Sequence, residues 1–127
     1  MCLAEESDIF VSAPAVVTGW GEASAGGGPN PKLRVVVEDV MDTAKCANSL
    51  KLPLNASATL CTSHYVMGAC AGDIGSPLVT QVCPDHWVLI GVLIRRDTCN
   101  NRSTPGLYSR VPVFRSWIDE VTSATTC

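Results

Sequence analysis

The 127-residue sequence lacks several features that mark common functional classes. No run of lysine or arginine exceeds two residues and the formal net charge is -3, which argues against nucleic acid as the main partner. No apolar stretch approaches the roughly 20 residues that a transmembrane helix needs, so we expect no membrane span. Acidic residues soon after Met1 do not fit a secretory signal peptide, which has a basic start and an apolar run. The sequence therefore looks incomplete at its N-terminus, as expected of a fragment, a splice product or a truncated gene model.

Cysteine, by contrast, is abundant, with seven residues. Cytosolic thiols are kept reduced, so this density favours an oxidising compartment. Asn55 and Asn101 each begin an N-x-S triplet, the acceptor pattern for N-glycosylation. We therefore expect a secreted glycoprotein. Because seven is an odd number, at least one cysteine lacks a partner within the chain, and it can bridge to another chain or to a missing segment.

The arrangement of apolar segments and turns predicts an all-β fold. Short apolar, β-branched stretches alternate with loops rich in glycine and proline, and the sequence shows neither an internal repeat nor a βαβ rhythm. Residues 1–14 are typical of a linker, and Asp42 can cap a short helix over 43–50. The expected strands are residues 15–20, 33–40, 58–61, 77–82, 87–94 and 106–111.

A second helix is expected near the C-terminus, at about residues 113–123. One apolar stripe with helical spacing supports it, formed by Phe114, Trp117, Ile118 and Val121. We interpret this stripe as core packing against the β-domain. Polar residues of the helix, among them Arg115, are expected to lie outside this stripe and to face away from the β-domain.

Four separate segments, in the right order and at about the right spacing, resemble the trypsin/chymotrypsin family. Residues 17–21 (V-T-G-W-G) resemble the start of its second barrel, and 70–78 (C-A-G-D-I-G-S-P-L) its C-x-G-D-S-G-G-P-L nucleophile loop. Residues 105–111 (P-G-L-Y-S-R-V) resemble its P-G-V-Y-x-R-V strand, and 114–118 its closing helix. The resemblance implies a single six-stranded antiparallel Greek-key barrel with a C-terminal helix over residues 15–127. This is the second of the family's two barrels.

The resemblance places Ile74 where the family has its nucleophilic serine. A branched alkyl side chain has no lone pair and no acidic proton, so it cannot attack a carbonyl. The family's catalytic histidine and aspartate belong to its first barrel, and His64 and His86 match neither position. Ser76 lies where the family usually has glycine, and we interpret it as a small residue tolerated at a tight turn. We therefore expect no enzymatic activity.

The rest of the nucleophile loop retains family features. The backbone N–H groups of the oxyanion hole fall at Gly72 and Ile74, so the loop can keep its shape without the serine. Asp73 matches the aspartate that pairs with the new N-terminal amine after zymogen cleavage. Here Asp73 is either a carboxylate without a partner or one that local N–H donors satisfy.

The family's substrate pocket is expected to survive only as a remnant. Its base falls near Gly68 and Ala69, which offer no carboxylate to attract lysine or arginine. The S-W-G segment that pairs with substrate backbone aligns with Ile94, Arg95 and Arg96, and Arg96 would place a long cation at the pocket mouth. The two arginines could bind an acidic partner, but we prefer the interpretation that both are solvated on a loop.

The resemblance also implies cross-links. Cys2 matches a linker cysteine that ties this half to upstream chain in the family. Cys83 and Cys127 have no clear counterpart and could pair with each other, with Cys2 or outside the chain. The two expected disulfides are Cys46–Cys61 and Cys70–Cys99.

Two C-x-x-H pairs raise a competing metal hypothesis. They begin at Cys61 and Cys83 and end at His64 and His86, a spacing that can bind zinc. The disulfide pattern competes for the same sulfurs, so we expect no metal and no cofactor.

Together these features predict a catalytically inactive serine protease homologue that acts by binding protein. Such a homologue could be a decoy, a cofactor or a scaffold in extracellular proteolysis. The expected partner is an upstream barrel or another chain, with Cys2 as one point of attachment. The alternative is a true trypsin-like endopeptidase represented by a truncated or variant chain, in which Ile74 is an artefact.

Overall fold

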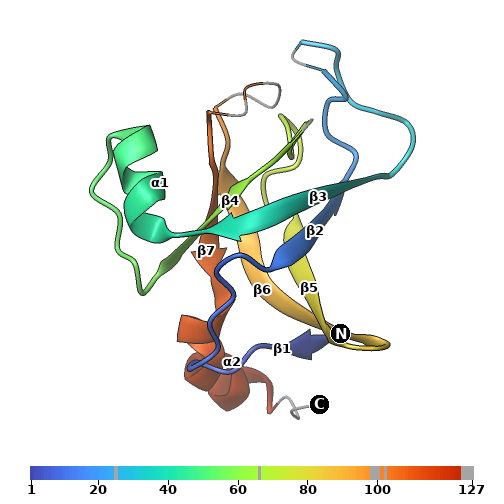
Figure 1. Ribbon diagram of the computed structural model, residues 1–127. Coiled ribbons are helices and arrows are strands. Elements are labelled where there is room, and N and C mark those ends of the chain that lie inside the picture. Colours follow the sequence, from blue (N-terminus) through green and yellow to red (C-terminus); the bar gives the residue numbers. More distant parts are fainter. Residues whose placement is uncertain (25, 66, 98–100, 102, 124–127) are drawn as a thin grey trace.

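The computed structural model describes residues 1–24, 26–65, 67–97, 101 and 103–123. Strands β6 and β7 pair with each other as well as with their sheet neighbours, so β2 to β7 close into a six-stranded antiparallel barrel, as the sequence predicted (Figure 1). The strands are β1 (Cys2–Leu3), β2 (Pro14–Gly19), β3 (Arg34–Met41), β4 (Thr59–Ser63), β5 (Pro77–Cys83), β6 (His86–Arg95) and β7 (Gly106–Arg110). The helical segments are α1 (Thr43–Leu50), the 3-10 turn η1 (Val111–Phe114) and α2 (Arg115–Thr122).

Strand alternation builds the barrel interior. Successive residues of a strand face opposite sides, so alternate residues of β2 and β3 point inward, whereas the alternation of β6 changes phase at a register shift near Ile90. Burial of apolar area then stabilises the closed sheet, at about 25 cal/mol per Å². The inward residues of the main core include Ala15, Val17, Val40, Leu60, Ala69, Leu78, Ile90, Leu93 and Tyr108. A charged residue, Glu38, occupies one of the inward positions of β3 and is fully buried.

Local signals fixed helix α1 as predicted. The Asp42 carboxylate accepts hydrogen bonds from the backbone N–H groups of Ala44 (3.0 Å) and Lys45 (3.2 Å), which otherwise have no partner within the helix. The helix ends where Lys51 takes a left-handed conformation, with φ of 53°.

The C-terminal helix has the predicted position but not the predicted buried face. Trp117 is 63% exposed, and Phe114 and Val121 are exposed as well, so the interpretation of the stripe as core packing is wrong. The buried residue of α2 is Arg115, whose Nη1 donates to the Leu3 carbonyl (3.0 Å). Its Nε donates to Asp119 (2.9 Å). Apolar spacing identified a helix, but polar contacts to the N-terminal segment decide which face is covered.

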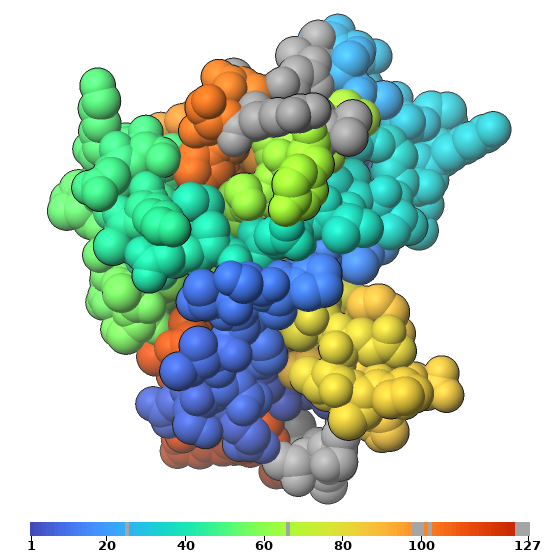
Figure 2. All heavy atoms as spheres, viewed as in Figure 1, coloured from blue at the N-terminus to red at the C-terminus, as the bar shows by residue number. Residues whose placement is uncertain are grey.

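The N-terminal segment packs on the barrel. Within residues 1–14, β1 pairs in parallel with β6, and Ala4 belongs to the core. Arg110 at the end of β7 donates to the Asp8 carbonyl (2.8 Å). Figure 2 shows this blue segment lying across one face of the molecule. A strand of two residues has no periodicity, so the sequence did not reveal β1, and the role of the segment as an inter-barrel linker stays a prediction. Neither helix in the described residues has the length and apolarity to cross a bilayer.

Candidate functional site

The loop between Cys70 and β5 forms a tight turn that presents its central residue. The Asp73 N–H donates to the Cys70 carbonyl (3.0 Å) and the Ser76 N–H to the Asp73 carbonyl (2.8 Å). Gly72 and Gly75 have φ of +88° and +90°, a conformation that glycine adopts without a Cβ penalty. The sequence G-D-I-G therefore folds into a turn that exposes the residue at position 74.

Ile74 stands at the apex of this turn and is 66% exposed. Together with the exposed Trp20 and Leu33 it borders a cleft of about 420 Å³. Ser76 lines the same cleft but is partly buried, and its carbonyl accepts from the Leu93 N–H (3.0 Å). The position expected for a nucleophile thus presents methyl groups, which can form apolar contacts but no acyl bond.

Asp73 is satisfied by local donors, which is one of the two alternatives that the sequence left open. Its carboxylate is buried and accepts from the backbone N–H groups of Gly21 (2.7 Å) and Cys70 (2.9 Å). A Cβ on Gly19 or Gly21 would overlap with this carboxylate. These glycines therefore allow the V-T-G-W-G strand end to pack directly against the loop.

Arg95 and Arg96 lie on opposite sides of the barrel wall. Arg95 is about half exposed, as predicted, and pairs with the equally exposed Asp97 (2.7 Å). The hydrogen bond from Arg95 lowers the pKa of the Asp97 carboxyl. The prediction of a solvated side chain is wrong for Arg96, which is 1% exposed and turned inward, with Nη2 2.7 Å from Glu38 Oε2. Successive residues of an extended chain point to opposite sides, and Arg96 finds a buried counter-ion there.

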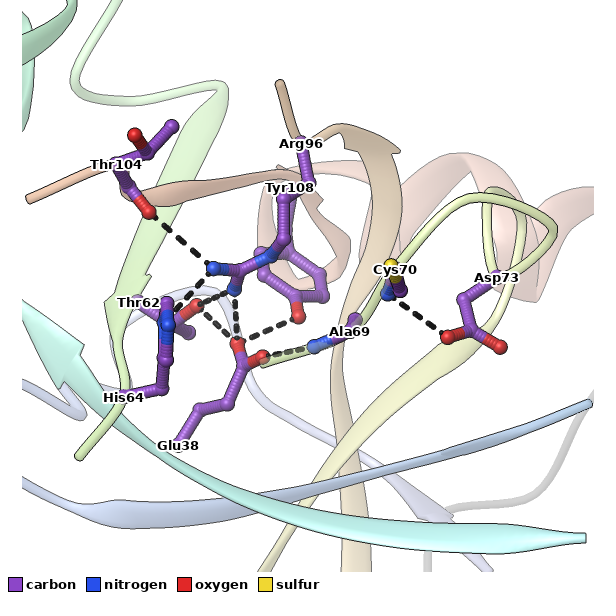
Figure 3. A network of polar contacts seen from close by, with 9 residues as sticks. All are labelled: Glu38, Thr62, His64, Ala69, Cys70, Asp73, Arg96, Thr104 and Tyr108. Carbon is purple, nitrogen blue, oxygen red and sulfur yellow. Dashed lines mark hydrogen bonds and ion pairs between the residues drawn. The ribbon is translucent and has the colours of Figure 1, made fainter. Parts of the chain in front are cut away.

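Glu38 is the centre of a polar network inside the barrel (Figure 3). Its Oε2 accepts from the Tyr108 hydroxyl (2.8 Å) and from the Thr62 hydroxyl. Its Oε1 accepts from the Ala69 N–H (2.7 Å). With Arg96 included, donors from β4, β7 and two loops converge on one carboxylate of β3. Burial raises the pKa of Tyr108, and the negative charge of Glu38 adds to this effect, so the hydroxyl stays protonated and donates.

The other side of the Arg96 guanidinium also meets acceptors. Nη1 lies 3.0 Å from His64 Nδ1 and 3.3 Å from the Thr104 carbonyl. Because arginine can only donate, His64 Nδ1 is the acceptor in this contact.

The guanidinium fills the place where the sequence put the base of a substrate pocket. A Cβ added to Gly68 would lie 2.6 Å from Arg96 Nη1, and one added to Gly106 would overlap with Nη2. Gly68 and Ala69 therefore lie against the Arg96–Glu38 pair, and their role as the base of a substrate pocket stays a prediction. Sequence reasoning missed Glu38, although an acidic residue at an inward position between Val36 and Val40 was a signal for a buried charge.

One expected disulfide lies within the described residues. Cys46 and Cys61 are bonded, which confirms that pairing and removes the Cys61 sulfur as a zinc ligand. Cys70 and Cys2 also belong to disulfides, whereas the predicted partner Cys99 and the C-terminal Cys127 lie outside the described residues. Cys83 is free and exposed.

The two glycosylation candidates are exposed. The Asn55 side chain accepts from the Ser57 N–H (3.0 Å), and the Asn101 side chain accepts from the Ser103 N–H (2.9 Å). Both asparagines are thus at the surface, and their glycosylation stays a prediction.

Comparison with known proteins gives a consistent result. The family model described as Trypsin matches residues 1–118. Transmembrane protease serine 11E of Mus musculus is 34% identical over 93% of the chain, and transmembrane protease serine 11A of Homo sapiens is 32% identical over 93%. Each match covers 29% of the relative, so the chain spans less than a third of the length of these curated relatives.

Proposed function

Because this chain belongs to the trypsin family, we propose that it is a catalytically inactive member that acts by binding protein. The observation that carries the proposal is Ile74, at the exposed apex of the loop where the family has its serine. Acyl transfer in this family begins with attack by the serine oxygen, and no group on isoleucine can replace it.

The surroundings of Ile74 support a binding role. The turn keeps its backbone form through Gly72, Asp73 and Gly75, so the loop remains ordered while its tip is apolar. Exposed Trp20, Leu33 and Ile74 share one cleft. Clustered exposed apolar side chains are typical of protein contact sites. A decoy, cofactor or scaffold in proteolysis needs such a contact surface and no nucleophile.

We place this activity outside the cell. The Cys46–Cys61 disulfide supports an oxidising compartment, because cytosolic thiols are kept reduced. The partner would be another barrel of the same protein or a separate extracellular protein.

A true endopeptidase is the second candidate, since the relatives are named as proteases. It requires that Ile74 be an error in the sequence. The buried Arg96–Glu38 pair argues against this, because a single error at position 74 does not produce a buried ion pair elsewhere in the chain.

Peptide sequencing of the protein from its natural source, combined with a hydrolysis assay on it, separates the two candidates. We expect isoleucine at position 74. We also expect no cleavage of peptide substrates after arginine, lysine or aromatic residues. Serine at position 74, or hydrolysis that a serine-directed inhibitor abolishes, would contradict the proposal.

A further inference from the structure

We propose that Glu38 and its neighbours form a guanidinium-binding site that the chain fills with its own Arg96. The inference concerns the pocket alone and goes beyond the loss of the nucleophile. The negative charge of the site comes from Glu38 on strand β3. Gly68 and Ala69, at the expected base of the pocket, carry no charge.

The carboxylate side of the site is held in place without Arg96. The Tyr108 hydroxyl (2.8 Å), the Thr62 hydroxyl and the Ala69 N–H (2.7 Å) all donate to Glu38. These neutral donors fix the orientation of the carboxylate but leave the charge of this buried group uncompensated. A buried carboxylate of this kind requires a cation to stay ionised.

The acceptors around the cation serve both terminal nitrogens of a guanidinium, whereas Arg96 Nε is buried without a hydrogen-bond partner among the described residues. Nη2 donates to Glu38 (2.7 Å) and contacts the Thr62 hydroxyl (3.3 Å). Nη1 contacts His64 Nδ1 (3.0 Å) and the Thr104 carbonyl (3.3 Å). Acceptors on both terminal nitrogens suit the rigid fork of a guanidinium, whereas an ammonium group is a single point charge.

Two glycines in the wall of the site leave room for this group. A methyl group at Gly68 would come within 2.6 Å of Arg96 Nη1 and 2.8 Å of Glu38 Oε1, and one at Gly106 would overlap with Nη2. The two glycines and the two charged residues therefore form one matched set.

The occupant is tethered, which makes it hard to displace. Arg96 follows directly after β6, so it faces Glu38 at a high effective concentration. Arginine side chains of other proteins cannot compete at ordinary concentrations. Any partner must therefore contact other surfaces, such as the cleft around Ile74.

Chemical rescue of Arg96→Ala tests the inference on the whole chain. Ethylguanidinium replaces the atoms that the substitution removes, and thermal unfolding reports its binding. We expect ethylguanidinium to raise the Tm of Arg96→Ala and to bind it about ten- to a hundredfold more tightly than ethylammonium, the ratio that a lost charged hydrogen bond implies. Wild type should not respond. Arg95→Ala is the matched control, since it removes the neighbouring exposed arginine, and it should not respond either.

Two results would overturn the inference. One is an Arg96→Ala variant that ethylguanidinium does not stabilise, and the other is an equal response of wild type or Arg95→Ala. If Arg96→Ala does not fold, hydrogen exchange of the arginine side chains in wild type decides instead. A filled site predicts that the Arg96 guanidinium protons exchange with water at least roughly tenfold more slowly than those of Arg95, because local opening must precede exchange. Equal rates would refute it.

Discussion

Replacing Glu38 with glutamine would remove the negative charge opposite Arg96 while keeping nearly the same shape. The side chains of Glu38 and Arg96 are 0% and 1% exposed and lie 2.7 Å apart, so water cannot compensate the cation that remains. Breaking one partner of such a buried pair costs about 3–5 kcal/mol. A single domain has a free energy of unfolding of about 5–15 kcal/mol, so Glu38→Gln should lower stability by a large fraction.

Urea unfolding measured by circular dichroism provides the assay, with Asp97→Asn as the matched control. That variant breaks the Arg95–Asp97 pair, whose side chains are about half exposed, and should leave the midpoint unchanged within error. The double variant Glu38→Leu/Arg96→Met should be more stable than Glu38→Gln, because no charge remains buried without a partner. The reasoning fails if Glu38→Gln costs no more than Asp97→Asn.

Three further predictions concern other parts of the chain. Above about pH 10 the unfolded chain releases the Tyr108 proton while the folded chain, with its raised pKa, retains it, so the free energy of unfolding should fall by about 1.4 kcal/mol per pH unit. Denaturant titration should show this slope lost in Tyr108→Phe and mostly kept in Tyr65→Phe, which changes an exposed side chain. Trp117→Gln should change stability by less than about 0.5 kcal/mol, because the side chain is exposed, and a loss above about 3 kcal/mol would mean that the helix stripe is covered. Replacing Cys46 and Cys61 with serine should cost about 3 kcal/mol, because their bond closes a 15-residue loop, and non-reducing peptide mapping should find that bond in the natural protein.

Local patterns determined most of the fold. The strands β2 to β7 follow from short β-branched stretches between turn residues, and α1 follows from the cap at Asp42. The family resemblance supplied the closure of these strands into a barrel. The two-residue strand β1 has no pattern of its own. The covered face of α2 depends on contacts between Arg115 and the N-terminal segment, more than 100 residues away, which helical spacing does not encode.

The candidate site was predictable only in part. The nucleophile loop and Ile74 follow from the resemblance, and the turn at Gly72 and Gly75 has the expected character. The burial of Arg96 could not be predicted from the sequence, because it depends on a contact with Glu38, 58 residues earlier in the chain. Adjacent arginines are usually solvated, and only the three-dimensional pairing shows which of the two turns inward.

Fluorophosphonate labelling tests most directly whether any serine of this protein is an activated nucleophile. Such probes bond covalently to activated serine oxygens, so intact mass spectrometry reports a nucleophile independently of substrate choice. With Ile74 at the loop apex, we predict an unchanged mass under conditions that label an active trypsin-family protease completely. Stoichiometric addition of one probe, mapped to Ser76 or to any other serine, would contradict the absence of catalysis.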